Sequence, residues 1–200
     1  METEIEVKFP SVDFTALRTM LRELGASRDQ PMRLMRRVII ETPELEAKNA
    51  FVRIRDEGDK TTLTYKQFEA ISLTGAKEIE VTVSDFENTI ALLEQVSLIH
   101  KSFQESRRET WRLDGVEIVL DEWPWLDPYI EIEGSSEEVV RDMAKRLGFS
   151  WEDAIFGSVT ELYRLQYPHG NASKLVTVSR LTFDDPLPAV ISGETVSASS

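Results

Sequence analysis

The stretch Glu4-Ile5-Glu6-Val7-Lys8, close to the start of the chain, alternates strictly between charged and apolar residues. In an extended strand, successive side chains point to opposite faces of the sheet. The two glutamates and the lysine therefore share one face, and Ile5 and Val7 share the other. Taken alone, such a face is typical of a solvated sheet surface. It indicates a functional site only if other strands bring matching charges to the same face.

The same pattern recurs in the second half of the chain, at Glu78-Ile79-Glu80-Val81. Each copy is followed by a capping sequence and an amphipathic segment, which predict helices at 11–24 and 84–96. Further strands are expected after each helix. The repeated order of strand, helix and strands indicates two related half-barrels.

Composition excludes several classes of protein. The chain has 200 residues, of which 41% are hydrophobic, so it suits one domain, or one domain plus a tail. It has no cysteine, no apolar run near the roughly 18 residues of a membrane span, and no signal-peptide pattern. A formal charge of −13 argues against broad binding to nucleic acid. We expect a cytoplasmic monomer or homodimer that binds neither nucleic acid nor membranes.

Apolar periodicity and turn residues predict the other elements. The expected strands span 4–8, 32–40, 51–55, 61–66, 78–81, 100–104, 107–113, 116–122 and 129–133. Two more helices are expected, at 135–147 and, interrupted near Gly157, at 150–165. Residues 1–167 would form the domain. Residues 168–200 would form a C-terminal extension that is partly disordered, although 181–187 would dock as a short segment.

Strands from both halves carry charges opposite an apolar face. The carboxylates lie at Glu4, Glu6, Glu78, Glu80, Asp121, Glu131 and Glu133. The cations lie at Lys8, Arg53, Arg55, Lys66 and Arg108. If these strands close into a barrel, the charges face either the outside or the lumen. The expected helices each have one apolar stripe and need an apolar sheet face to pack on, which favours charges that line a water-filled tunnel.

Such a lumen would have more carboxylates than cations, and carboxylates this close would otherwise take up protons. Mg²⁺ or Mn²⁺ prefers carboxylate oxygen and water, and binds phosphate oxygens at the same time. The guanidinium group of arginine donates two parallel hydrogen bonds to a phosphate. The pattern therefore indicates a site for a polyanion together with a divalent metal.

These motifs resemble the signature of the CYTH superfamily, the triphosphate tunnel metalloenzymes. The first stretch is similar to the Glu-x-Glu-x-Lys motif of that family, and five later motifs follow in the family's order, within residues 1–165. They are Val52-Arg53-Ile54-Arg55, Leu63-Thr64-Tyr65-Lys66, Glu78-Ile79-Glu80, Leu120-Asp121 and Tyr129-Ile130-Glu131-Ile132-Glu133. The family includes class IV adenylyl cyclases, thiamine triphosphatases and inorganic triphosphatases.

The resemblance implies an α+β fold, in which an eight-stranded antiparallel β-barrel forms a tunnel and helices pack on its outside. It implies that one or two Mg²⁺ or Mn²⁺ ions are held by Glu4, Glu6, Asp121, Glu131 and Glu133. The triphosphate would be bound by Lys8, Arg53, Arg55, Lys66 and Arg108. Glu78 and Glu80 would line the tunnel and orient these cations. Together with Lys66 they are the expected catalytic residues, although pairing with arginine or lysine is an equally open role for the two glutamates.

Two positions depart from the family pattern. The family often has Lys-x-Arg on a strand of the second half, where this chain has Ser106-Arg107-Arg108. Arg108 alone is carried over, and Arg107 competes for the inward face because a one-residue slip exchanges the two. Some family hydrolases use that lysine with a tyrosine on the second strand to activate water. The corresponding strand offers Ile39 and Ile40 here.

Three functions fit this pattern. The first is hydrolysis of an inorganic, nucleoside or thiamine triphosphate. In this reaction Arg53, Arg55 and Lys66 would stabilise charge on the leaving oxygens, and Glu78 or a metal-bound water would accept the proton. The second is a cyclase that forms cyclic AMP and pyrophosphate from ATP. The third is a non-catalytic module that binds polyphosphate or a nucleotide.

Overall fold

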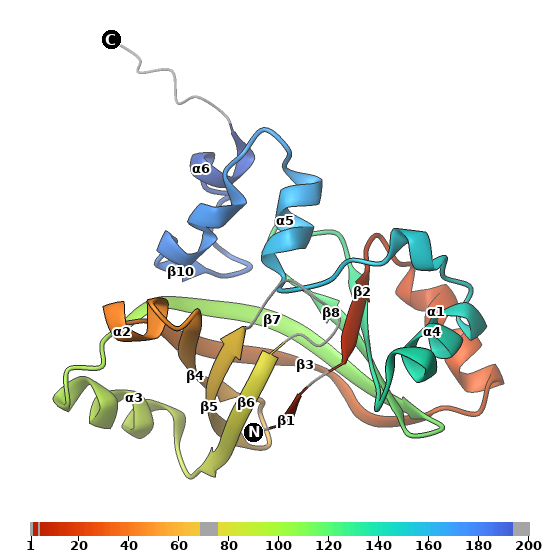
Figure 1. Ribbon diagram of the computed structural model, residues 1–200, viewed down its shortest axis with the longest axis horizontal. Helices are drawn as coiled ribbons and strands as arrows, with labels where there is room; N and C mark the ends of the chain where they lie inside the picture. Colours follow the sequence, from red (N-terminus) through yellow and green to blue (C-terminus); the bar gives the residue numbers. More distant parts are fainter. Residues whose placement is uncertain (1, 4, 69–75, 194–200) are drawn as a thin grey trace.

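The computed structural model describes residues 2–3, 5–68 and 76–193, and its strands form one sheet (Figure 1). The strand order is β1-β6-β5-β4-β3-β7-β8-β9-β2, with antiparallel neighbours throughout. The strands are β1 (Glu2–Thr3), β2 (Glu6–Phe9), β3 (Ser27–Ile40), β4 (Ala50–Asp56), β5 (Thr61–Phe68), β6 (Ala76–Val83), β7 (His100–Leu113), β8 (Val116–Glu122), β9 (Tyr129–Glu133) and β10 (Arg180–Leu181).

The start of the chain supplies both ends of this sheet. Glu2 of β1 is opposite Glu78 of β6, and Glu6 of β2 is opposite Glu133 of β9. Among the described residues no pairing joins β1 to β2, so the sheet is not shown to be closed. The α+β class and the antiparallel sheet with helices are confirmed, whereas the eight-stranded barrel is not. The structure has ten strands where the sequence predicted nine, because β1 and β10 were not expected and the two strands expected at 100–104 and 107–113 form one strand.

The two longest strands meet in the middle of the sheet. β7 is a single strand of 14 residues, where the sequence predicted two strands at 100–104 and 107–113. It stays extended because it pairs along its length with β3, which also has 14 residues. β3 follows helix α1 (Phe14–Glu23), and β7 follows helix α3 (Phe86–Gln95). Each half of the chain therefore has a short strand, a helix and a long strand in the same order.

The helices begin where side chains can accept hydrogen bonds from free backbone amides. Asp13 caps α1 through Thr15 N and Ala16 N, whereas Ser11, where the expected helix 11–24 began, has φ 55°. Asp85, and not Ser84, caps α3. Ser136 caps α4 (Glu137–Arg146), near the start of the helix expected at 135–147. The remaining helical elements are α2 (Pro43–Glu46), α4 (Glu137–Arg146), η1 (Trp151–Asp153), α5 (Thr160–Gln166), η2 (Ala172–Thr177) and α6 (Ala189–Ser192).

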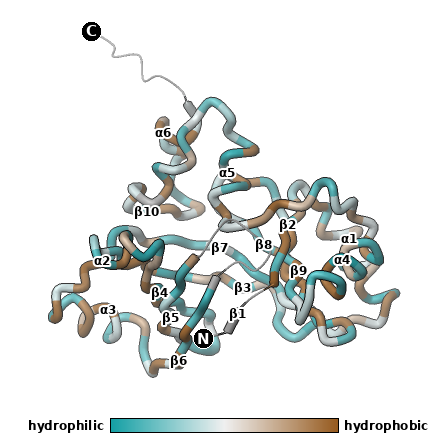
Figure 2. Tube along the Cα trace, in the orientation of Figure 1, coloured by the Kyte–Doolittle hydropathy of each residue, from teal (hydrophilic) through white to brown (hydrophobic). Residues whose placement is uncertain are grey.

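Two apolar clusters attach helices to one face of the sheet, and this leaves the other face to polar side chains. Helices α1 and α4 cover β2, β8 and β9 through Leu21, Met143, Val7 and Ile118. Figure 2 shows β2 beside these two helices. Phe86 of α3 packs in the second cluster against β3 and β4. None of the helices in the described ranges has the length and apolar character needed to cross a bilayer.

The C-terminal segment folds against the sheet up to residue 193. β10 pairs with Phe103 and Gln104 in the first half of β7, while β8 pairs with the second half, from Arg107 on. A third apolar cluster joins this segment to α5 and the end of β8; its buried members include Trp123, Tyr163, Leu175, Leu181 and Ile191. The expected boundary at 167 thus lies inside a shared cluster. Short docking at 181–187 agrees with β10, residues 189–192 of the extension form α6, and residues 194–200 lie outside the described residues.

Candidate functional site

A cavity of about 930 Å³ lies on the polar face of the sheet. Ten of the residues selected from the sequence line it: Glu6, Lys8, Arg53, Arg55, Lys66, Glu78, Glu80, Arg108, Glu131 and Glu133. Glu4 lies outside the described residues. Asp121 is fully buried behind the cavity wall and does not line it. The charges from both halves of the chain therefore face one common space, as the alternating patterns predicted.

One wall of the cavity pairs a lysine with two carboxylates. Lys8 Nζ lies 2.8 Å from Glu6 Oε1 and 3.4 Å from Glu131 Oε1. Lys8 is opposite Glu131 in the β2–β9 register, so neighbouring strands bring these groups together. Burial disfavours the ammonium ion, but the two carboxylates outweigh it and raise the pKa of Lys8. Burial likewise opposes ionisation of Glu131, yet Lys8 and Arg108 lower its pKa to about 2. These groups are therefore ionised.

Arg108 is held on the cavity wall by two carboxylates. Its Nε donates to Asp121 Oδ1 at 2.8 Å, and its Nη2 donates to Asp121 Oδ2 and, at 2.9 Å, to Glu131 Oε2. Tyr129 also donates its hydroxyl to Asp121 Oδ2, at 3.3 Å. Burial raises the pKa of Asp121 against the opposing effect of Arg108. Arg107 points outward and pairs with Glu122, so Arg108 is the arginine of this strand that faces the cavity.

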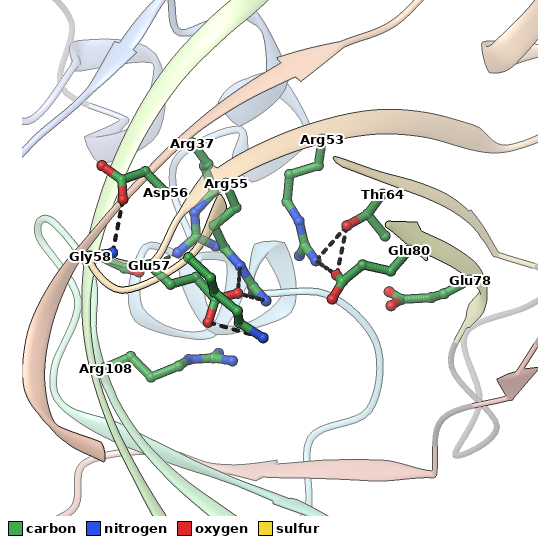
Figure 3. Close-up of polar contacts among 12 residues, drawn as sticks. Arg37, Arg53, Arg55, Asp56, Glu57, Gly58, Thr64, Glu78, Glu80 and Arg108 are labelled. Atoms are coloured by element: carbon green, nitrogen blue, oxygen red, sulfur yellow. Dashed lines mark hydrogen bonds and ion pairs between the residues drawn. The ribbon is translucent and has the colours of Figure 1, made fainter. Parts of the chain in front are cut away.

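The opposite wall places two glutamates of β6 against cations of β4 and β5. Arg53 Nη2 lies 3.7 Å from Glu80 Oε2, and Thr64 Oγ1 donates to the same oxygen at 2.8 Å (Figure 3). Lys66 Nζ lies 2.5 Å from Glu78 Oε1. The contacts of Thr64 with Glu80 and of Lys66 with Glu78 follow from the β5–β6 register, in which the residues of each pair are opposite each other. The three expected catalytic residues thus lie together.

Arg55 is anchored by a residue that sequence reasoning missed. Its Nε donates to Glu57 Oε1 at 2.9 Å, and Glu57 is buried although it lies at the β4–β5 turn. Arg33 Nη2 and Lys60 Nζ lie 3.4 and 3.8 Å from Glu57 Oε2. Burial disfavours the charged carboxylate, but Arg55 and Lys60 outweigh it and lower the pKa of Glu57. The turn position alone gave no sign of this burial.

A second missed residue is Arg37 on β3, which lines the cavity and is buried. Figure 3 shows its side chain beside that of Arg55, with Arg53 and Arg108 approaching the same space. Burial, followed by repulsion from Arg55 and Arg53, lowers the pKa of Arg37 to about 9. Burial and Arg55 lower the pKa of Arg53 to about 10. One buried and three partly buried guanidinium groups around one cavity form a strong attractor for an anion.

The carboxylate wall has the donor chemistry for a divalent cation. Glu6 and Glu131 converge on one point, which Lys8 Nζ now occupies, and Glu133 is opposite Glu6 on the neighbouring strand. Glu117 of β8 continues this row, because it is opposite Glu133 and also lines the cavity. Among the described residues, no three carboxylates are already arranged as metal ligands. The oxygens suit Mg²⁺ or Mn²⁺, provided that Lys8 turns away.

Comparison with known families gives one match, to the CYTH domain, over residues 2–155. No curated protein matches the chain. Among solved structures, the protein PH1012 from Pyrococcus horikoshii OT3 is 26% identical, with a TM-score of 0.64 over 76% of this chain and 93% of that one. C-terminal residues 156–193, which include α5, η2, β10 and α6, lie beyond the family match.

Two more distant structures share the fold. An adenylate cyclase-like protein from Vibrio parahaemolyticus is 14% identical, with a TM-score of 0.71 over 80% of this chain and 97% of that one. HpAC1 from Hippeastrum, an adenylyl cyclase-like protein described with a dominant triphosphatase activity, is 16% identical, with a TM-score of 0.54 over 82% of this chain and 95% of that one. At these identities the likeness concerns the fold alone.

Proposed function

This chain belongs to the CYTH domain family, and on that premise we propose that it is a divalent-metal-dependent enzyme that hydrolyses a triphosphate. The observation that carries the proposal is the convergence of Arg53, Arg55, Lys66 and Arg108 on one cavity, opposite the carboxylates of β2 and β9. A linear triphosphate has several negative charges along its length, and a row of guanidinium groups matches it. The triphosphatase activity described for HpAC1 agrees with this reaction.

We also propose that the sheet closes into a tunnel around the substrate. Support comes from the first strands, because β1 and β2 are the two ends of the strand order and are separated in the chain only by residues 4 and 5. A closed sheet would shield the phosphates from bulk water and strengthen every charge contact inside. Helices α1, α3 and α4 on the apolar face are consistent with a polar lumen.

The metal would be held by Glu6, Glu131 and Glu133, with Glu4 as a further ligand expected from the sequence. Asp121 would join them only when Arg108 turns from it toward a phosphate, because that ion pair now buries the carboxylate. When bound, the ion neutralises the phosphate charge and polarises the phosphoryl group under attack. Lys8 would leave Glu6 and Glu131 for the substrate in the same exchange of partners.

The β4–β6 wall would supply the proton acceptor and the leaving-group contacts. Lys66 now pairs with Glu78; once Lys66 contacts a phosphate, Glu78 is free to accept a proton from the attacking water. Glu80 with Thr64 orients Arg53, which would stabilise charge on the leaving oxygens. The isoleucine Ile39 lines the cavity where some relatives have tyrosine, so water activation would rest on Glu78.

Product analysis tests this reaction. The full chain is incubated with tripolyphosphate, ATP or thiamine triphosphate, each with Mg²⁺ or Mn²⁺. Release of orthophosphate that requires the metal is the expected result. Binding with no turnover of any of the three would identify a non-catalytic module and overturn the proposal.

A cyclase is the second candidate, and one observation favours it. Phe51 and Phe68 both line the cavity, with ring centroids 6.1 Å apart, and Lys66 Nζ lies 5.8 Å from the centroid of Phe68. Aromatic rings beside a phosphate-binding lysine could stack on a nucleotide base. Formation of cyclic AMP and pyrophosphate from ATP, in place of orthophosphate, would identify this activity in the same incubation.

A further inference from the structure

Three buried hydrogen-bond donors of the cavity wall have no hydrogen-bond partner, at Arg37, Arg53 and Trp123, and two of them lie side by side. Arg37 Nε and Trp123 Nε1 are buried nitrogens without a hydrogen bond, and both residues line the cavity. They are neighbours, since the guanidinium carbon of Arg37 lies 4.5 Å from the centroid of the Trp123 ring. A buried polar group without a partner costs free energy unless a ligand or water satisfies it. Because both groups can only donate, the missing partner is an acceptor.

Charge compensation around Arg37 is also incomplete. Its Nη2 donates to the Ser106 hydroxyl, which is neutral, and no carboxylate of the described residues lies within salt-bridge distance. Asp121 attracts it from further away, while Arg53, Arg55 and Arg108 repel it. Arg37 is 5% exposed, so water compensates little of its charge. An arginine kept only for structure would be expected to have a carboxylate partner at this depth.

Arg37 also lies on the strand next to that of the two arginines, Arg53 and Arg55, proposed to bind the triphosphate. Arg37 of β3 is opposite Arg55 of β4, and adjacent strands are about 4.8 Å apart. Trp123 follows β8 on the far side of Arg37, where Leu175 of the C-terminal segment also lines the cavity. This position is within reach of one more phosphoryl group beyond those at Arg53 and Arg55.

We propose that Arg37 and Trp123 form an additional phosphate subsite, so that the protein binds a linear tetraphosphate more tightly than a triphosphate. The inference rests on the proposed function, because it extends the phosphate path of the same cavity. The fourth phosphoryl group accepts hydrogen bonds from Arg37 Nε and Trp123 Nε1, and its charge compensates that of Arg37. Leu175 and Val159, which also line the cavity, pack in the same apolar cluster as Trp123.

The test compares the dissociation constants of tripolyphosphate and tetrapolyphosphate by calorimetry without divalent metal, so that the proposed metal-dependent hydrolysis does not consume the anions. The wild-type chain is expected to prefer tetrapolyphosphate by about tenfold or more, the effect of a charge-assisted hydrogen bond. Arg37→Gln removes the charge and Nε, and Trp123→Phe removes only the Nε1 donor while keeping a ring. Arg107→Gln is the matched control, because Arg107 also stacks on an aromatic ring, Phe183, but outside the cavity.

Loss of most of the preference in both variants, with the preference kept in Arg107→Gln, is the expected result. Should Arg37→Gln fail to fold, Trp123→Phe still decides the matter. Equal affinity of the wild-type chain for the two anions would overturn the subsite and leave the proposed triphosphate site intact. A preference that survives both variants would also overturn it. Failure to bind tripolyphosphate at all would overturn the proposed function and this inference together.

Discussion

Arg108 on the cavity wall forms an ion pair with Asp121 behind it, in which Arg108 Nε donates to Asp121 Oδ1 at 2.8 Å. Asp121 is fully buried, and its other hydrogen bond comes from the Tyr129 hydroxyl at 3.3 Å. The pair fixes Arg108 in the orientation that also reaches Glu131. One residue thus serves the stability of the sheet and, in the proposed function, the binding of substrate.

Arg108→Gln should therefore lower the free energy of unfolding by about 3 kcal/mol, because it leaves a buried carboxylate without its charge partner. Arg107→Gln, one residue away, should cost less than about 1 kcal/mol, since its pair with Glu122 is exposed. Urea denaturation of both variants measures the difference. Equal losses would show that the Arg108 pair contributes no more than a surface pair.

Lys8→Met should tighten the binding of Mn²⁺ in the absence of substrate, by about tenfold, because Glu6 and Glu131 lose the ammonium group between them. The same variant should bind tripolyphosphate more weakly. Calorimetric titration with each ligand measures both effects. Lys101→Met is the control, since Lys101 also contacts two glutamates, Glu41 and Glu46, but is exposed. Weaker Mn²⁺ binding by Lys8→Met would contradict the proposed metal site.

Arg55→Ala should abolish triphosphate turnover without unfolding the protein. Glu57 loses one partner in this variant, but Arg33 and Lys60 remain within 3.4 and 3.8 Å of its Oε2 atom. The melting temperature should fall by no more than a few degrees, whereas kcat should fall by about 100-fold or more. Thermal denaturation and phosphate release are measured on the same sample. Retained turnover would count against Arg55 as a phosphate ligand.

Glu78→Gln and Glu80→Gln should distinguish the roles of the two glutamates of β6. If Glu78 accepts the proton, its amide variant should lose kcat by about 100-fold with little change in KM. Glu80 and Thr64 together orient Arg53, so Glu80→Gln should lower kcat less than Glu78→Gln does and should also raise KM. Steady-state kinetics on tripolyphosphate distinguish these outcomes. Two variants that lose only stability would indicate that both glutamates have a structural role.

Sequence patterns predicted the cavity wall well where strands alternate strictly. Arg53, Arg55, Glu131 and Glu133 lie on strands with apolar residues between them, so one face was evident. Arg37 was missed because Arg36 precedes it directly. With two consecutive arginines, the strand pattern does not show which of the two side chains points into the cavity. Val38 and Ile40 are buried on the opposite face of the strand, and the alternation of faces from these two residues would have placed Arg37 on the cavity side.

Other features depend on contacts between distant residues and could not be predicted locally. The sequence around Glu57 indicates an exposed turn. Its burial is explained by the contact with Arg33, which lies 24 residues earlier in the chain. The break predicted within β7 is absent because β3 pairs with it along its length. Polar composition after residue 168 suggested disorder, but a few apolar side chains, including Leu175 and Leu181, are enough to attach the segment.

The C-terminal segment should accordingly unfold together with the sheet. Leu181 is fully buried in β10, against β7, whereas Val190 of α6 is 42% exposed. Leu181→Ala should lower the free energy of unfolding by about 3 kcal/mol through loss of packing, and Val190→Ala by less than about 0.5 kcal/mol. A single transition, seen alike by far-ultraviolet circular dichroism and tryptophan fluorescence, is expected for both variants. Because Trp123 and Leu181 share one cluster, a separate early transition in Leu181→Ala would mean that the segment is an independent unit.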